Sequence, residues 1–192
     1  MNLVEKVAQM SVVKPLDICL TIKFVIQTGL PPNSQLQYWI KDLGVGRMIF
    51  MSGSAMDLVT PIQKLQSWAI NSLLLATDIE EGVGQRFVRA TDFSPPMEIP
   101  AITKTNLKKA QEDTETIGAI TAQAAMAICG NWALAPMVSG NNDPNHPVIN
   151  IRAFGETTVL VIQLAKALIW GPQQYLVLAT AHKFSKCREY GY

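Results

Sequence analysis

The sequence predicts an α/β fold with a parallel sheet. Short apolar runs alternate with stretches of helical periodicity along the 192 residues, which is the pattern of successive βαβ units. The run from Leu73 to Ala76 is continuously apolar, as in a strand buried on both faces. Each longer polar segment follows a predicted strand and not a helix. That asymmetry is typical of the ligand-binding edge of a parallel sheet.

The first half of the chain contains three predicted helices and two predicted strands. Asn2 caps the first helix with Glu5 three positions later, and Gly44 stands where the second helix ends. Pro61 is expected to shift the start of the third helix or to kink it. The helices are predicted at residues 2–10, 34–44 and 54–69, and the strands at residues 46–51 and 73–77.

The second half repeats the alternation with two longer helices. A polar loop from residue 78 to Pro100 precedes the first of them, and Gly130 is expected to close that helix. A second polar loop, residues 139–155, is rich in Asn, Asp and Pro, which are turn-forming residues. The helices are predicted at residues 106–129 and 156–171, and the strands at residues 132–138 and 175–181.

Composition excludes several classes of function. A net charge of +1 provides no global field for nucleic acid, and Lys23 and Lys166 interrupt the longest apolar stretches, so we expect no membrane span. The three cysteines are scattered, which predicts no disulfide framework and a cytoplasmic location. No cofactor or metal is expected, because Phe87 occupies the third Gly position of G-x-G-x-x-G and no Cys/His spacing fits zinc.

Charged side chains lie where two of the strands end. Asp78 and Arg86 follow the strand at 73–77, and His182 and Lys183 follow the last strand. Arg152 lies in the loop between them. Carboxylate and guanidinium groups supply the acceptors and paired donors that suit a hydroxyl-rich ligand. The alternative for the first loop is a solvated segment with an internal ion pair.

The chain resembles the N-terminal domain of the family 3 glycoside hydrolases, in particular the β-N-acetylhexosaminidase branch, from Leu3 to Phe184. Three stretches carry the resemblance. "DIEEGVGQR" matches the motif D-x-E-G-G-x-V-x-R, with Glu81 in place of the first paired glycine. The other two stretches are "NWALAPMVSGNNDPNHPVINIRAFGE", similar to a strand and loop ending in N-x-R-S-F-G, and "VLATAHKF", similar to the strand before K-H-F-P-G-H-G-D-T.

The resemblance implies part of a (β/α)8 barrel of the TIM type, roughly its first five strands with their helices. It implies cleavage of β-linked N-acetylglucosaminides or glucosides with retention of configuration. Asp78, Arg86 and Arg152 would bind sugar hydroxyls, together with the pair His182 and Lys183.

Departures from the family motifs predict a chain without activity of its own. The Lys-His pair is reversed, and the positions of the general acid/base His and its orienting Asp hold Cys187 and Glu189. A barrel of this kind needs about 250 residues, so the strand with the nucleophilic Asp is expected to be absent. We therefore expect residues 1–192 to form one truncated barrel domain with a divergent tail at 185–192. A frameshift near Phe184 is one hypothesis for this departure.

Two other functions remain open. One is a non-catalytic carbohydrate-binding half barrel that depends on a partner or associates with itself through its open sheet edge. The other is an unrelated small α/β domain with solvated loops.

Overall fold

The computed structural model describes residues 2–10, 12–13, 32–103 and 106–182. Its main sheet has five strands in the order β1-β2-β4-β6-β7, and every pairing is parallel. Each new strand is added to the same side of the previous one, as in a singly wound barrel, and the order never reverses as it does in a doubly wound sheet. The strands are β1 (Val12–Val13), β2 (Arg47–Ile49), β4 (Leu74–Thr77), β6 (Trp132–Ala133) and β7 (Leu178–Ala179).

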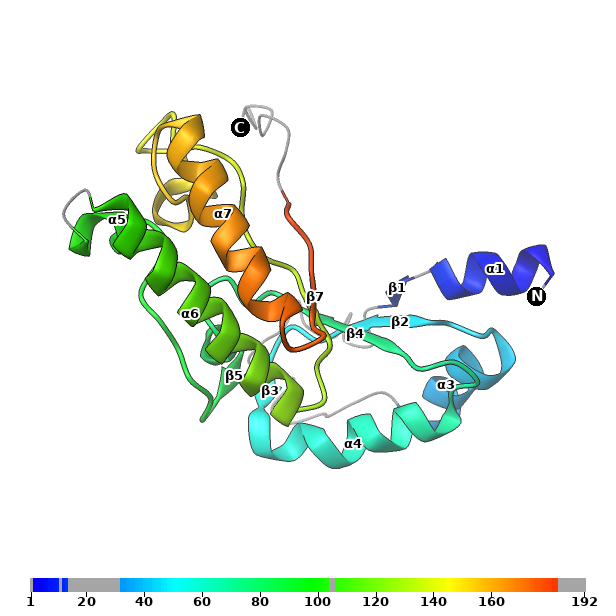
Figure 1. Cartoon of the computed structure of the whole chain (residues 1–192). Coiled ribbons are helices and arrows are strands. Elements are labelled where there is room, and N and C mark those ends of the chain that lie inside the picture. The colour runs from blue at the N-terminus through cyan, green and yellow to red at the C-terminus, as the bar shows by residue number, and fades with distance from the viewer. Residues whose placement is uncertain (1, 11, 14–31, 104–105, 183–192) are drawn as a thin grey trace.

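Helices connect these strands and lie along the sheet (Figure 1). Between β2 and β4 the chain forms α4, between β4 and β6 it forms α6, and between β6 and β7 it forms α7. The helices are α1 (Leu3–Met10), α3 (Asn33–Gln37), α4 (Ala55–Trp68), α5 (Glu98–Ile102), α6 (Leu107–Ala127) and α7 (Thr158–Gln173), with a π-helical turn η2 (Tyr38–Asp42) and 3-10 turns η3 (Val83–Gln85) and η4 (Asn150–Arg152). This is the predicted α/β fold, a partial barrel.

The two faces of the sheet differ in burial. Met48, Leu75 and Ala133 are buried in a single core with apolar residues of α4, α6 and α7. The alternate side chains Arg47 and Trp132 are only partly buried, and the Arg47 guanidinium lies 5.6 Å from the centre of the Trp132 ring. Side chains alternate across a strand, so the helices cover one face and leave the other more open.

Helices α6 and α7 pack closely through two glycines. A Cβ atom on Gly118 of α6 would lie 2.9 Å from the Leu168 carbonyl oxygen, and one on Gly171 of α7 would meet the Glu115 carbonyl oxygen. The absence of a side chain at these positions lets the two backbones approach. The two helices lie side by side at the left of Figure 1.

Most predicted elements are present, and several boundaries were wrong. Helix α6 ends at Ala127, and the left-handed residue that follows it is Cys129 (φ 63°), not Gly130. The strand predicted at 132–138 is interrupted. Trp132–Ala133 form β6, Pro136 has no N–H to donate to a ladder, and Met137 beyond it forms an isolated parallel bridge with His182. Helix α7 continues past Gly171 and Pro172 to Gln173, so β7 begins only at Leu178.

The polar loop predicted from residue 78 to Pro100 contains regular structure. Within it β5 (Phe87–Val88) pairs in parallel with β3 (Gly53–Ser54), which forms a second, two-stranded sheet. Helix α5 begins at Glu98, before Pro100. Two-residue strands have too few residues to show a period in sequence, so the loop prediction missed them.

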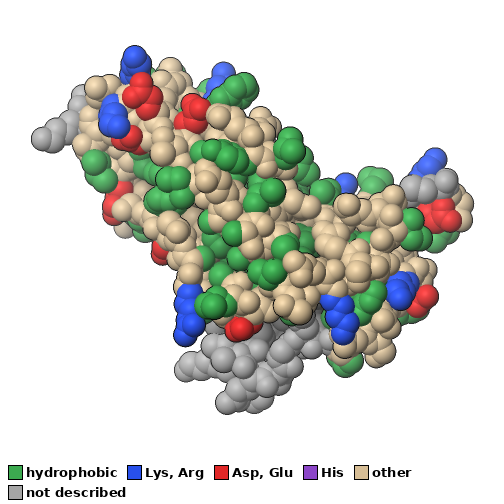
Figure 2. Space-filling model, turned by 60° about the horizontal axis from the view of Figure 1, so that its bottom comes forward, with side chains coloured by type: hydrophobic (Ala, Val, Ile, Leu, Met, Phe, Trp, Pro, Cys, Tyr) green, Lys and Arg blue, Asp and Glu red, His purple; other side chains and the backbone are tan. Residues whose placement is uncertain are grey.

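The N-terminal helix has the predicted cap and an exposed apolar face. The Glu5 N–H donates to Asn2 Oδ1 (2.9 Å) and the Asn2 N–H donates to Glu5 Oε2 (2.7 Å), which is a reciprocal capping arrangement. None of its residues is buried, and α1 extends away from the helical layer (Figure 1). Hydrophobic side chains are also spread over the underside of the molecule, with most charged side chains toward its rim (Figure 2).

Candidate functional site

The segment after β4 places a carboxylate beside a guanidinium. Asp78 follows the last residue of β4, and its Oδ2 accepts a hydrogen bond from Arg86 Nη2 at 2.9 Å. The two side chains are 21% and 30% exposed, respectively. The intervening loop turns at Gly82 (φ 95°), where a Cβ atom would lie 2.8 Å from the Thr91 carbonyl oxygen. Both groups therefore remain accessible at the rim of the sheet.

Glu80 forms a second and more buried charge cluster. Its side chain is 1% exposed, and it accepts two hydrogen bonds from Arg152, from Nε to Oε2 (2.8 Å) and from Nη2 to Oε1 (2.7 Å). His182 Nε2 lies 2.7 Å from the same Oε1, a close ion-pair contact in which the ring N–H is not well aligned with the oxygen. Arg152 Nη1 also donates to the Val148 carbonyl oxygen at 3.0 Å.

Three separate segments supply this cluster. Glu80 follows β4, Arg152 ends η4 in the loop after β6, and His182 follows β7. The backbone holds His182 in place, because its N–H donates to the Pro136 carbonyl oxygen (3.0 Å) and its carbonyl oxygen accepts from the Val138 N–H (3.1 Å). The cluster thus joins the carboxyl ends of three parallel strands, where active sites of barrel folds lie.

The electrostatics of Glu80 and Glu81 differ. Burial would raise the pKa of Glu80, but the contacts with His182 and Arg152 outweigh burial and leave that pKa lowered. The hydrogen bonds to Glu80 raise the pKa of Arg152. Burial raises the pKa of Glu81, and the carboxylates of Asp92 and Glu80 raise it further. Glu80 is thus held ionised, whereas Glu81 lies among other carboxylates.

The structure brings four of the five predicted binding residues to one edge of the sheet. Asp78 pairs with Arg86, and Arg152 and His182 both contact Glu80. The remaining binding residue, Lys183, lies outside the described residues, as do Cys187 and Glu189. His146 belongs to the loop after β6, where its Nδ1 accepts from the N–H groups of Val148 and Ile149, both at 3.2 Å.

Sequence reasoning did not assign Glu80 to the site. Its spacing two residues after Asp78 was the available signal, since such residues point the same way in an extended chain. Its partners Arg152 and His182, however, lie 72 and 102 residues further along the chain, and no local pattern connects them.

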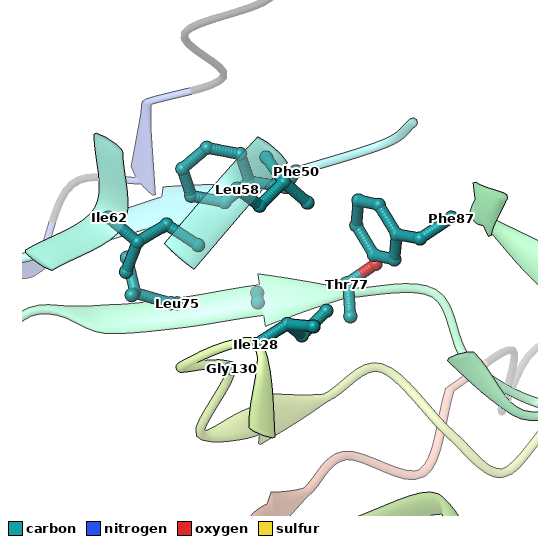
Figure 3. A pocket seen from close by; sticks show the side chains of 9 residues that line it. Phe50, Leu58, Ile62, Leu75, Thr77, Phe87, Ile128 and Gly130 are labelled. Atoms are coloured by element: carbon teal, nitrogen blue, oxygen red, sulfur yellow. The ribbon is translucent and has the colours of Figure 1, made fainter. Parts of the chain in front are cut away.

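Neither of two hollows in the described structure is lined by Asp78, Glu80, Arg86 or Arg152. A crevice of about 10 Å³ is lined by Phe50, Leu75 and Thr77 among other residues, mostly apolar (Figure 3). A hollow of about 250 Å³ lies between α3 and α4, beside Trp68.

Among the described residues, no group of three or more His, Cys, Asp or Glu side chains is arranged to hold a metal ion. No helix in that part of the chain is long and apolar enough to span a membrane.

Curated proteins similar to the chain are glycosidases. The chain is 26% identical over 161 residues to a β-N-acetylglucosaminidase/β-glucosidase of Cellulomonas fimi, which covers 84% of this chain and 28% of the relative. It is 30% identical over 151 residues to β-hexosaminidase A of Pseudoalteromonas piscicida, which covers 74% of this chain and 25% of that protein. The chain therefore matches only about a quarter of the length of these relatives.

Solved structures and a family model agree on the fold. The chain superposes on a glycoside hydrolase family 3 β-N-acetylglucosaminidase from Paenibacillus sp. str. FPU-7 with a TM-score of 0.68 and 23% identity, covering 96% of this chain and 33% of that one. NagZ from Neisseria gonorrhoeae gives a TM-score of 0.69 and 21% identity, covering 81% and 47%. The model of the glycosyl hydrolase family 3 N terminal domain matches residues 2–187. The chain belongs to glycosyl hydrolase family 3 and carries its N-terminal domain.

Proposed function

We propose that the charged rim binds a β-linked N-acetylglucosaminide or glucoside, as expected of a family 3 glycosidase barrel. The names of the relatives support this choice of substrate, since they include β-N-acetylglucosaminidase, β-glucosidase and β-hexosaminidase. The observation that carries the proposal is the pair of carboxylate–guanidinium contacts at the carboxyl ends of the strands, with Asp78, Arg86 and Arg152 each partly exposed. Such groups donate to and accept from sugar hydroxyls.

Sugar binding by the 192-residue chain tests this proposal. Titration with N-acetylglucosamine and with glucose, followed by NMR, should shift signals of residues near Asp78 and Arg152. Asp78→Asn should weaken binding about tenfold, because a charged acceptor of hydroxyl protons becomes a neutral amide. Asp57→Asn, the same change on an exposed residue of α4, is the matched control. Equal affinity for the Asp78 variant and the wild type would contradict the proposal.

We further propose that the 192-residue chain binds sugar without turning it over. Retaining hydrolysis needs a nucleophile and an acid/base group, which in most families are two carboxyl groups about 5 Å apart and which the resemblance gives here as an Asp and a His. Asp78 and Glu80 are each ion-paired with a guanidinium group, so we assign neither of them as the nucleophile or the acid/base group. With an aryl N-acetylglucosaminide as substrate, we expect the wild-type chain to release the phenol no faster than the Asp78→Asn variant does. A higher rate for the wild-type chain would refute this part.

A partner-dependent half barrel is the second candidate, and one observation favours it. β1 and β7 end the described sheet, and α1 and α7 beside them expose apolar side chains. Unpaired edges and apolar patches favour association with another chain or copy. On this view the polypeptide acts in carbohydrate binding only after a second chain covers the sheet. Sedimentation velocity distinguishes the assembled from the monomeric state.

A further inference from the structure

We propose that Glu80 is a positioning residue for the sugar site, holding Arg152 and His182 in the orientation in which they face the ligand. This inference rests on the proposed sugar binding and assigns a role to a residue that does not itself reach the ligand. The Glu80 side chain is 1% exposed, and both of its oxygens already accept from Arg152. A buried carboxylate with both oxygens occupied can act on a ligand only through its partners.

The contacts of Arg152 define which of its donors remain for a ligand. A guanidinium has five N–H donors. Among the described residues, Nε and Nη2 donate to Glu80, and Nη1 donates to the Val148 carbonyl oxygen. Two N–H bonds, one on each terminal nitrogen, are therefore left without an acceptor there. The bidentate geometry fixes the guanidinium plane, so these two donors point in a defined direction. The Arg152 side chain is 27% exposed, which leaves it accessible to a ligand.

His182 depends on the same oxygen. Its Nε2 lies 2.7 Å from Glu80 Oε1, which Arg152 Nη2 also contacts at 2.7 Å. One carboxylate oxygen thus separates two groups that are both cationic when His182 is protonated. Without that charge the guanidinium and a protonated imidazole would repel each other, and either would turn away from its present position.

The geometry also explains how a His is accommodated at position 182. The matching family motif has Lys there, and this chain has His182 followed by Lys183. An imidazole is shorter than a lysine side chain and has a donor only at fixed ring positions. The Glu80 carboxylate, anchored on both oxygens by Arg152, stands within contact distance of the ring nitrogen. Glu80 therefore contacts His182 as well as Arg152, so a change in its charge acts on both side chains.

Glu80→Gln in the full 192-residue chain tests the inference. The variant keeps the shape of the side chain but replaces one accepting oxygen with an NH2 group, which repels the N–H donors of Arg152. We expect at least a tenfold loss of affinity for N-acetylglucosamine, and a change in the 15N signals of the His182 ring and of Arg152 Nε. Glu98→Gln is the matched control, because Glu98 is an exposed residue of α5. Unchanged affinity and unchanged side-chain signals in a folded Glu80→Gln protein would overturn the inference.

A measurement on the wild-type chain covers the case in which the variant does not fold. Hydrogen exchange of Arg152 Nε–H should be at least tenfold slower than that of Arg89 Nε–H, since Arg89 is exposed. Equal exchange rates would show that Glu80 does not hold the guanidinium, and the inference would fail. If the wild-type chain binds neither sugar, the proposed function fails instead, and the exchange rates and 15N signals alone decide whether Glu80 orients its two partners.

Discussion

Two neighbouring glutamates at the end of β4 show how strongly single contacts decide the properties of a residue. Burial would raise the pKa of Glu80, but His182 and Arg152 lower it below the ordinary value of 4.5. Burial and neighbouring carboxylates raise the pKa of Glu81 above the same value. A group with a lowered folded-state pKa stabilises the fold above its unfolded pKa, and this contribution is lost as the pH falls through the folded pKa. A carboxyl group with a raised folded-state pKa destabilises the fold at neutral pH, and this penalty disappears as the pH falls and the group is protonated.

We predict that Glu80→Gln and Glu81→Gln change stability in opposite directions. At pH 7, Glu80→Gln should lower the free energy of unfolding by about 1–3 kcal/mol, because it removes the charged acceptor of two hydrogen bonds from Arg152, a side chain that is 27% exposed and therefore partly solvated. Glu81→Gln should leave the free energy of unfolding unchanged or raise it. Below about pH 4.5 the wild type should lose stability while the Glu80→Gln protein loses less. Urea denaturation at pH 7 and pH 4 measures both effects, and equal pH dependence in the wild type and Glu80→Gln would contradict the prediction.

At the scale of elements, the contact between α6 and α7 depends on two glycines. Gly118→Ala should lower the free energy of unfolding by about 1–3 kcal/mol, because the added Cβ lies 2.9 Å from both the Leu168 carbonyl oxygen and Pro172 Cδ. The control is Gln123→Ala on the exposed side of α6, where little change is expected. Alanine favours a helix over glycine by about 1 kcal/mol, so a stabilised Gly118→Ala protein would show that the helices can separate without cost.

The sequence predicted the elements whose signals are local. Helices α4, α6 and α7 show apolar periodicity over three or more turns, and the run at β4 is continuously apolar. The ends of elements depend on partners elsewhere: α7 continues past Gly171 because that residue packs on α6. The site residues could likewise be predicted only where their partners are close in the sequence. Asp78 and Arg86 are eight residues apart and were found together, whereas Glu80 meets residues from two distant loops.

At the scale of the whole molecule, α7 and the edge strand beside it expose large apolar side chains. The outer stripe of α7 exposes Ile162 and Trp170, which are 47% and 60% exposed, and Leu178 of the adjoining edge strand is 48% exposed. The described sheet has no strand beyond β7 on that side. Removing apolar side chains from water favours association, so this stripe and edge are the natural contact surface between two copies.

We predict that the chain associates with itself through the stripe on α7. At tens of micromolar, sedimentation velocity should show a dimer or larger species. The double variant Ile162→Glu/Trp170→Glu should need at least tenfold more protein to associate, because two charges replace apolar area at the contact. Gln63→Glu/Gln123→Glu is the matched control, because it adds two carboxylates at exposed positions of α4 and α6, away from the stripe. A wild-type monomer at all concentrations, or equal weakening by this control variant, would show that the stripe is not the contact surface.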